Sequence, residues 1–151
     1  MSLITAENSK PGSHDWQLTR MRLDKNEGFR SSVIEGYCSR QSLKAGESLD
    51  IFVSTKPAAR FKIEIFRTGY YGGRGARKMM ELGPLQGVTQ STPKPGTKNL
   101  HECRWTPATT LKIPADWPSG TAFSAAITCG TTLLPISRIW SFFAVPPTSS
   151  T

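Results

Sequence analysis

The segment RFKIEIFR at 60–67 places the strongest constraint on how this chain can fold. Apolar Phe61, Ile63 and Ile65 alternate with charged residues, which is the period of a β-strand with one buried face. A slip of one residue in its pairing would expose three large apolar side chains, each at a cost of roughly 1.5–3 kcal/mol. The segment therefore predicts a strand of fixed register in a sheet with a packed inner face.

Shorter apolar runs separated by turn signals carry a similar pattern along the chain. They lie at residues 33–38, 48–54, 110–114, 121–129 and 138–145. The chain also has 13 Gly and 11 Pro among 151 residues, and helix formers nowhere gather into a long run of period 3.6. These features predict an all-β protein, an antiparallel β-sandwich of about seven strands.

The chain divides into three parts by composition. Residues 1–31 are polar and charged, and their few apolar side chains, among them Trp16, predict one strand or a packed arm. Residues 32–145 hold the apolar runs and predict the sandwich domain, and residues 146–151 predict a C-terminal tail. A long exposed loop is expected at 83–99, where glycine, proline and hydroxyl residues dominate.

The segment GYYGGRGAR at 69–77 follows the alternating strand directly. It matches neither the GxGxxG dinucleotide pattern nor the GKS or GKT ending of a nucleotide-binding loop. RGG segments that bind RNA occur in tandem within low-complexity chain, whereas this copy is single. We therefore interpret the segment as a tight turn between strands in which glycines permit positive φ. The expected turn formers are Gly69, Gly72, Gly73 and Gly75.

Aromatic and basic side chains of this turn are the candidate binding residues. Tyr70 and Tyr71 are expected to lie over the turn as a platform for a partner protein. Arg74 and Arg77 are expected to anchor carboxylates or backbone carbonyls across that contact. Trp117, in the turn ADWPSG, is expected to lie over a sheet end and joins the same set. The alternative interpretation is that the segment is a solvent-exposed hairpin with no function in binding.

The formal charge of +8 favours acidic partners such as nucleic acid or anionic lipid. The basic residues are nevertheless scattered among the acids, and the acid-free cluster contains only Arg67, Arg74, Arg77 and Lys78. We expect a solvated basic surface and no nucleic-acid binding. The 21 uncharged residues at 117–137 are interrupted by proline and glycine, so no membrane span is expected. The N-terminus lacks a secretory signal pattern, so either the chain stays inside the cell, the location favoured here, or a leader has been removed.

Residue types and spacings predict neither an active site nor a metal site. The cysteines are widely spaced, no CxxC occurs, and His14 and His101 lie far apart. No GxSxG occurs, so a Ser-His or Cys-His pair is conceivable only through His101. Cys38 and Cys103 are either bridged in an oxidising compartment or, as buried thiols, free. The sequence favours a binding or structural module.

Several segments, taken together and in order, resemble one known family. They are IEGYCSRQS at 34–42, AGES at 45–48, VSTKP at 53–57, EIFRTGYYGGRGAR at 64–77, LGPLQG at 82–87, ECRW at 102–105 and IPADWPSG at 113–120. Together with ENSKPGSHDWQLTRMRLDK upstream, residues 6–120 resemble the N-terminal β domain of proteins similar to the N,N-dimethylformamidase large (beta) subunit. Because many separate segments match in order, the resemblance is specific.

The resemblance implies an immunoglobulin-like sandwich at the start of a longer polypeptide that carries its catalytic region further along. In the related amidase, iron held by tyrosines and a glutamate polarises the amide and activates water. Those ligands belong to the downstream region, and none maps onto Tyr37, Tyr70 or Tyr71. The resemblance therefore implies no catalytic residue and no cofactor in this chain, and a catalytic domain or subunit as its partner.

After Gly120 the sequence departs from the family's pattern, which continues with an aromatic-rich strand pair. We expect that the reading frame slipped near residue 121 and left a truncated gene product. Two other functions are considered beside the accessory module. A carbohydrate-binding sandwich would use Tyr70, Tyr71, Trp105 or Trp117 as stacking platforms, and an iron-dependent amidase would act alone.

Overall fold

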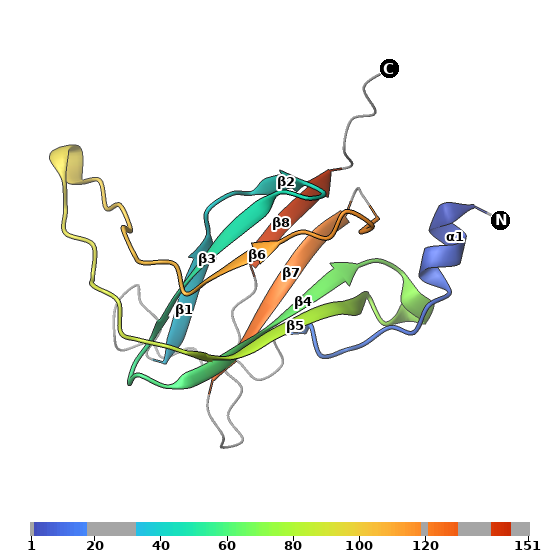
Figure 1. Ribbon diagram of the computed structural model, residues 1–151, viewed down its shortest axis with the longest axis horizontal. Helices are drawn as coiled ribbons and strands as arrows, with labels where there is room; N and C mark the ends of the chain where they lie inside the picture. Colours follow the sequence, from blue (N-terminus) through green and yellow to red (C-terminus); the bar gives the residue numbers. More distant parts are fainter. Residues whose placement is uncertain (1, 18–32, 119–120, 130–139, 146–151) are drawn as a thin grey trace.

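The computed structural model describes residues 2–17, 33–118, 121–129 and 140–145 (Figure 1). Within these ranges the chain is mostly β-strand. Helical structure in the described residues is limited to α1 (Leu3–Asn8) and two 3₁₀ turns, η1 (Tyr71–Gly73) and η2 (Thr97–Asn99). No helix in this part of the chain is long and apolar enough to cross a membrane.

Eight strands form two sheets in the described ranges. They are β1 (Ile34–Cys38), β2 (Ser42–Lys44), β3 (Ser48–Thr55), β4 (Arg60–Thr68), β5 (Ala76–Gln86), β6 (Thr109–Lys112), β7 (Thr121–Cys129) and β8 (Trp140–Val145). One sheet has the order β1-β3-β6 and the other β2-β8-β7-β4-β5. Every pairing is antiparallel except the parallel contact of β2 with β8. The all-β, antiparallel prediction is confirmed, with one strand more than expected.

The core lies between the two sheets and explains their packing. Ile51 and Val53 of β3 face Ile63 and Ile65 of β4 in one buried cluster. The cluster is completed by Ile34, Leu43, Leu49, Phe61, Leu111 and Ile113. Both sheets thus bury one apolar face against the other, which is the arrangement of a β-sandwich. The alternation in 60–67 has the predicted register, because its apolar positions are buried and its charged ones are not.

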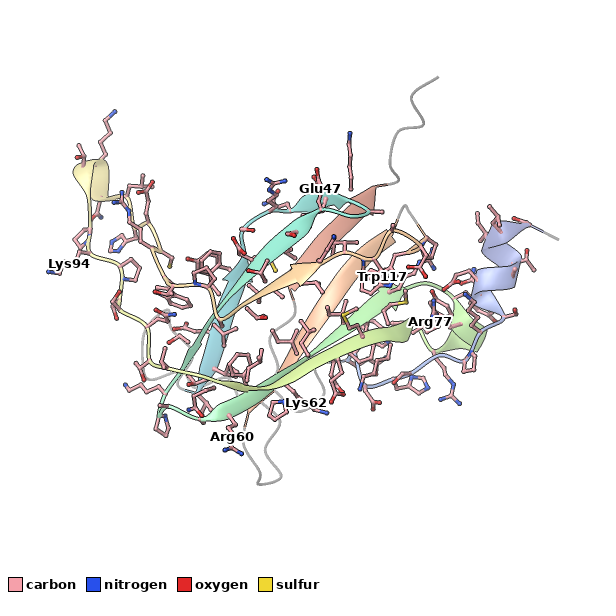
Figure 2. The ribbon with its side chains drawn as sticks, in the orientation of Figure 1. Glu47, Arg60, Lys62, Arg77, Lys94 and Trp117 are labelled. Atoms are coloured by element: carbon pink, nitrogen blue, oxygen red, sulfur yellow. The ribbon has the colours of Figure 1, made fainter. Side chains whose placement is uncertain are left out.

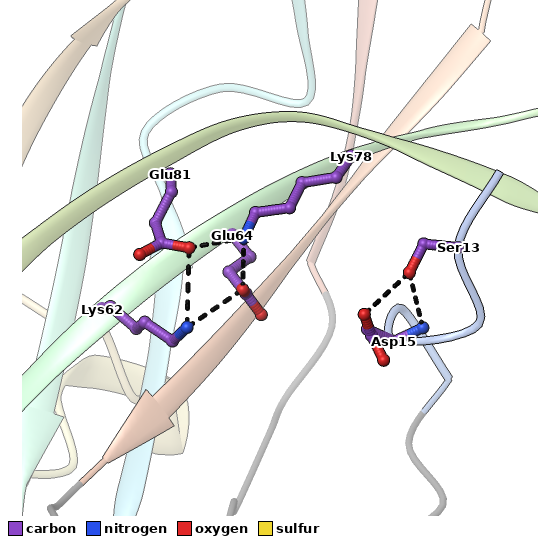
Figure 3. Close-up of polar contacts among 6 residues, drawn as sticks. All are labelled: Ser13, Asp15, Lys62, Glu64, Lys78 and Glu81. Atoms are coloured by element: carbon purple, nitrogen blue, oxygen red, sulfur yellow. Dashed lines mark hydrogen bonds and ion pairs between the residues drawn. The ribbon is translucent and has the colours of Figure 1, made fainter. Parts of the chain in front are cut away.

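The charged positions of β4 and β5 form a closed network on the outer face (Figure 3). Lys62 Nζ lies 3.1 Å from Glu64 Oε1, and Lys78 Nζ lies 2.7 Å from the same oxygen. Both lysines also pair with Glu81. Each of the two lysines therefore contacts two carboxylates, and each of the two glutamates contacts two ammonium groups. These four charged side chains on the outer face of β4 and β5 are thus paired with opposite charges.

The structure corrects the bounds of the exposed loop that was predicted at 83–99. The exposed loop begins after Gln86 and not at residue 83, because β5 continues past Gly83 and Pro84 with an irregular register against β4. It also extends past residue 99, because the segment 102–105 forms no strand. The loop projects beyond the sheets (Figure 1), and Trp105 anchors its base by donating from Nε1 to the Ser91 carbonyl at 2.8 Å.

Cys38 and Cys103 are both free thiols, Cys38 half-buried and Cys103 exposed. Burial raises the pKa of the Cys38 thiol to about 11. At neutral pH this thiol is therefore protonated and a poor nucleophile. Of the two alternatives left open by the sequence, the structure has the free thiols, but Cys103 is exposed and not buried as expected.

Candidate functional site

The glycine-rich segment forms the corner between β4 and β5, against which α1 packs (Figure 1). The corner is closed by backbone hydrogen bonds from Gly69 N to the Gly75 carbonyl at 3.0 Å and from Gly73 N to the Tyr70 carbonyl at 2.9 Å. Gly72, Gly73 and Gly75 have φ of 63°, 84° and 83°, conformations that L side chains rarely adopt. The segment is thus a turn that joins two antiparallel strands.

Gly69 differs from the other three glycines of the turn, because it does not have a positive φ. A glycine is needed here because the Tyr71 ring lies too close for a side chain. A Cβ at this position would lie 2.8 Å from Cε2 of Tyr71. Tyr71 itself has a positive φ of 41°, which is unusual for an aromatic residue. The ring is only 2% exposed, so tertiary packing holds this backbone conformation in place.

The two tyrosines of the corner have different environments. Tyr70 is 69% exposed, whereas Tyr71 is buried with its hydroxyl in a polar cluster. Arg67 Nη1 donates to the Tyr71 hydroxyl oxygen at 2.6 Å, and that hydroxyl donates to Glu7 Oε1 at 3.0 Å. Of the two predicted platform residues, Tyr70 is therefore the one that presents its ring to solvent.

A carboxylate from the N-terminal arm lies between two arginines of the corner. Arg67 of β4 and Arg77 of β5 are directly paired across the two strands. Arg77 donates to Glu7 Oε1 from Nη2 at 2.6 Å and from Nε at 3.0 Å, while Arg67 Nη1 lies 3.8 Å from the same oxygen. Like charges directly opposite each other destabilise a sheet. Glu7 provides the negative charge that this pair requires.

The arm, residues 2–17, contacts the corner at further points. Asn8 Oδ1 accepts from the Tyr70 backbone N–H at 3.0 Å, and Ser13 N donates to the Ala76 carbonyl at 2.8 Å. The Trp16 indole donates from Nε1 to the Arg74 carbonyl at 2.9 Å. The Trp16 indole also packs so closely against Gly75 that no side chain fits there, because a Cβ at residue 75 would lie 2.6 Å from Cζ2 of the ring. The part of the predicted arm that the structure describes is therefore packed on the corner.

The Glu7 carboxylate is strongly stabilised in its charged form. Burial alone would raise the pKa of this group, but hydrogen bonds from Lys10, Arg77 and Tyr71 outweigh burial and lower the pKa from 4.5 to about 2. Burial lowers the pKa of Arg77, and the bonds with Glu7 and Tyr71 reverse this into a net rise. Both partners therefore remain ionised at neutral pH.

Of the two further predicted residues, Arg74 belongs to this corner, whereas Trp117 packs elsewhere. Arg74 is exposed, and its carbonyl rather than its guanidinium takes part in the contact with Trp16. Trp117 is half-buried and packs against the core between the sheets (Figure 2). Sequence reasoning did not identify Glu7 or Trp16 as site residues. The only signal for Arg67 was its place in the acid-free basic cluster.

The described residues offer a site for a carboxylate but not for a metal ion. Among them, no group of three His, Cys, Asp or Glu side chains is placed to hold a metal. Tyr71 and Glu7 are in contact, the residue types that hold iron in the related amidase. Here, however, the Glu7 carboxylate is occupied by Arg77 and Lys10. A positively charged cluster does not fit a cation, so we derive no iron chemistry from these residues.

Comparison with known proteins supports the resemblance. Residues 62–133 match the model of the family described as N,N-dimethylformamidase beta subunit-like, C-terminal. No curated protein matches the chain. Residues 62–133 of the chain are therefore similar to this dimethylformamidase-like family. The family description assigns the matched region to a C-terminal part, whereas the resemblance suggested an N-terminal one. The match also continues past Gly120, where the resemblance was expected to end.

Proposed function

We propose that this chain is a non-catalytic, immunoglobulin-like β-sandwich module of a dimethylformamidase-like protein, which packs against or orients a catalytic domain or subunit. The match of residues 62–133 to the family model supports the part of this proposal that assigns the chain to a dimethylformamidase-like protein. The strand order supports the fold, because the chain crosses repeatedly between two antiparallel sheets, as in immunoglobulin-like domains. The corner formed by α1, η1 and the adjoining strand ends is the surface that we assign to the contact.

The observation that carries this assignment is that α1 and the corner against which it packs both expose large apolar side chains. Leu3 and Ile4 of α1 are 90% and 73% exposed, and Tyr70 lies just before η1. These are three of the five large apolar side chains exposed among the described residues; the other two, Val88 and Leu100, lie in the long loop. Exposed apolar groups and an exposed basic residue, here Arg74 of the corner, are typical of a protein interface.

A binding measurement with the catalytic polypeptide of the same protein family tests the proposal. Tyr70→Ala should weaken association at least about tenfold, because aromatic residues near the centre of an interface carry much of its energy. Leu100→Ala, which removes an exposed side chain from the loop, is the matched control and should change association little. Equal effects of the two substitutions, or no association of the unaltered chain, would contradict the assignment.

The non-catalytic part of the proposal has a separate test. The isolated chain should not hydrolyse formamides when it is supplied with iron, and turnover above the uncatalysed rate would show an enzyme. The carbohydrate-binding alternative receives less support from the structure. Tyr71 and Trp105 are buried, at 2% and 8% exposure, so two of the four rings offered as stacking platforms do not face solvent. A glycan-binding screen distinguishes this alternative.

A further inference from the structure

The paired arginines of the corner form a preorganised binding site for an anion. Arg67, Tyr71 and Arg77 direct a guanidinium, a hydroxyl and a second guanidinium toward one oxygen of Glu7. We call these three residues the carboxylate socket. All three side chains belong to the β4–β5 corner, whereas the bound carboxylate comes from the arm, 64 residues from Tyr71 and 70 from Arg77 in the sequence. The socket and its occupant are thus separate parts of the chain.

The socket has donor capacity that Glu7 leaves unused. Arg67 Nε is buried and has no hydrogen-bond partner among the described residues. Arg67 Nη1 reaches the Tyr71 hydroxyl but lies 3.8 Å from Glu7, beyond hydrogen-bond distance. Buried donors without partners are uncommon in folded proteins. The socket therefore has a hydrogen-bond donor that its present ion pair with Glu7 does not use. We interpret it as a site that accepts a carboxylate.

The arm has few means of holding its own structure. Helix α1 has six residues, with Ser2 capping its N-terminus through a hydrogen bond from Ile4 N. Isolated helices of this length are unstable in water, so α1 depends on its contacts with the corner. The arm contacts the corner at Glu7 and Asn8 of α1 and, beyond the helix, at Ser13 and Trp16. The arm therefore resembles a short peptide ligand that is recognised at four points.

We propose that the carboxylate socket is a peptide-binding site that takes the N-terminal arm as a separable ligand, so that a peptide of residues 2–17 binds the socket in trans. The chemical class recognised is a glutamate side chain on one turn of capped helix, followed by a tryptophan. This inference does not depend on the proposed function, because it concerns contacts within the chain.

The test uses the full chain with Glu7→Gln, which keeps the arm but removes the charge that competes for the socket. A fluorescent peptide of residues 2–17 is titrated with this variant and with the unaltered chain, and its anisotropy is measured. Charge-assisted hydrogen bonds are about twice as strong as neutral ones, so the variant should bind the peptide at least about tenfold more tightly than the unaltered chain does. A peptide that itself carries the Glu7→Gln substitution should lose most of that binding.

Substitutions in the socket complete the test. In the Glu7→Gln background, Arg77→Gln and Tyr71→Phe should each weaken peptide binding, and Tyr71→Phe decides the matter if Arg77→Gln fails to fold. Arg60→Gln, at the exposed start of β4, is the matched control and should leave binding unchanged. The inference is overturned if the Glu7→Gln and unaltered chains bind the peptide equally, or if the substituted peptide binds as well as the unaltered peptide. It is also overturned if Arg60→Gln weakens binding as much as Tyr71→Phe.

Discussion

Arg67 and Arg77 lie directly opposite each other across β4 and β5, and the carboxylate of Glu7 accepts two hydrogen bonds from Arg77 beside that pair. Two guanidinium groups on directly paired residues of neighbouring strands repel each other unless an anion lies between them. The corner can therefore keep both arginines only by attracting a carboxylate.

Glu7→Gln should destabilise the chain by about 2 kcal/mol, because it leaves two partly buried arginines without a counter-ion. The loss is limited by release of the arm, which lets water reach both guanidinium groups. Urea unfolding followed by circular dichroism measures the free energy. Glu102→Gln is the matched control, since Glu102 pairs with Arg104 at a highly exposed site, and it should change stability by less than about 0.5 kcal/mol. Equal effects would show that the Glu7 contacts contribute no more than a surface ion pair.

The contribution of Glu7 should also depend on pH in a defined direction. The pKa of this group is lowered from 4.5 to about 2 in the folded chain. Its stabilising effect is then fully present above pH 4.5 and is lost as the pH falls toward about 2, because the unfolded chain takes up the proton first. The difference in unfolding free energy between the unaltered chain and Glu7→Gln should shrink across that interval. A difference that stays constant down to pH 2 would contradict the assigned pKa.

The centre of the sandwich was predictable from the sequence because burial there follows a simple period. In β4 the alternation of Phe61, Ile63 and Ile65 determines which face is inside, and no distant residue is needed to read it. A strand after the turn was predicted, but not the full extent of β5, because Gly83 and Pro84 interrupt its second half and few of its side chains are fully buried. Its position depends on pairing with β4, which local sequence does not show.

The candidate site was predicted only in part, for a similar reason. The turn and its positive-φ glycines are local features, so their residue types indicate them. The partner of Arg77 is 70 residues away, and a single glutamate in a polar segment carries no periodic signal. Which of the two tyrosines is buried also depends on where the arm packs. Both were therefore predicted to have the same role, although only Tyr70 is exposed.

The core prediction can be tested at Ile63, which is fully buried and lies in the middle of β4 between β5 and β7. Ile63→Ala should destabilise the chain by roughly 3 kcal/mol, because it removes apolar contacts and leaves a cavity that the sheets cannot fill. Lys62→Ala, one residue away on the outer face, should cost less than about 1 kcal/mol. Urea unfolding of both variants provides the comparison. Similar costs for the two would show that the apolar face of β4 is not the inner one.

The docking of the arm can be separated from backbone strain by comparing two glycines. Gly46 and Gly75 both have positive φ, at 89° and 83°, so alanine at either position should cost about 1 kcal/mol of backbone strain. A Cβ at Gly46 meets no atom within 4 Å, whereas at Gly75 it would lie 2.6 Å from the Trp16 ring. Gly75→Ala should therefore displace Trp16 and break the hydrogen bond from its indole to the Arg74 carbonyl. Solvent exchange of the Trp16 indole proton, followed by NMR, should become faster in Gly75→Ala and stay unchanged in Gly46→Ala. Unchanged exchange in both variants would mean that the arm does not rest on the corner through Trp16.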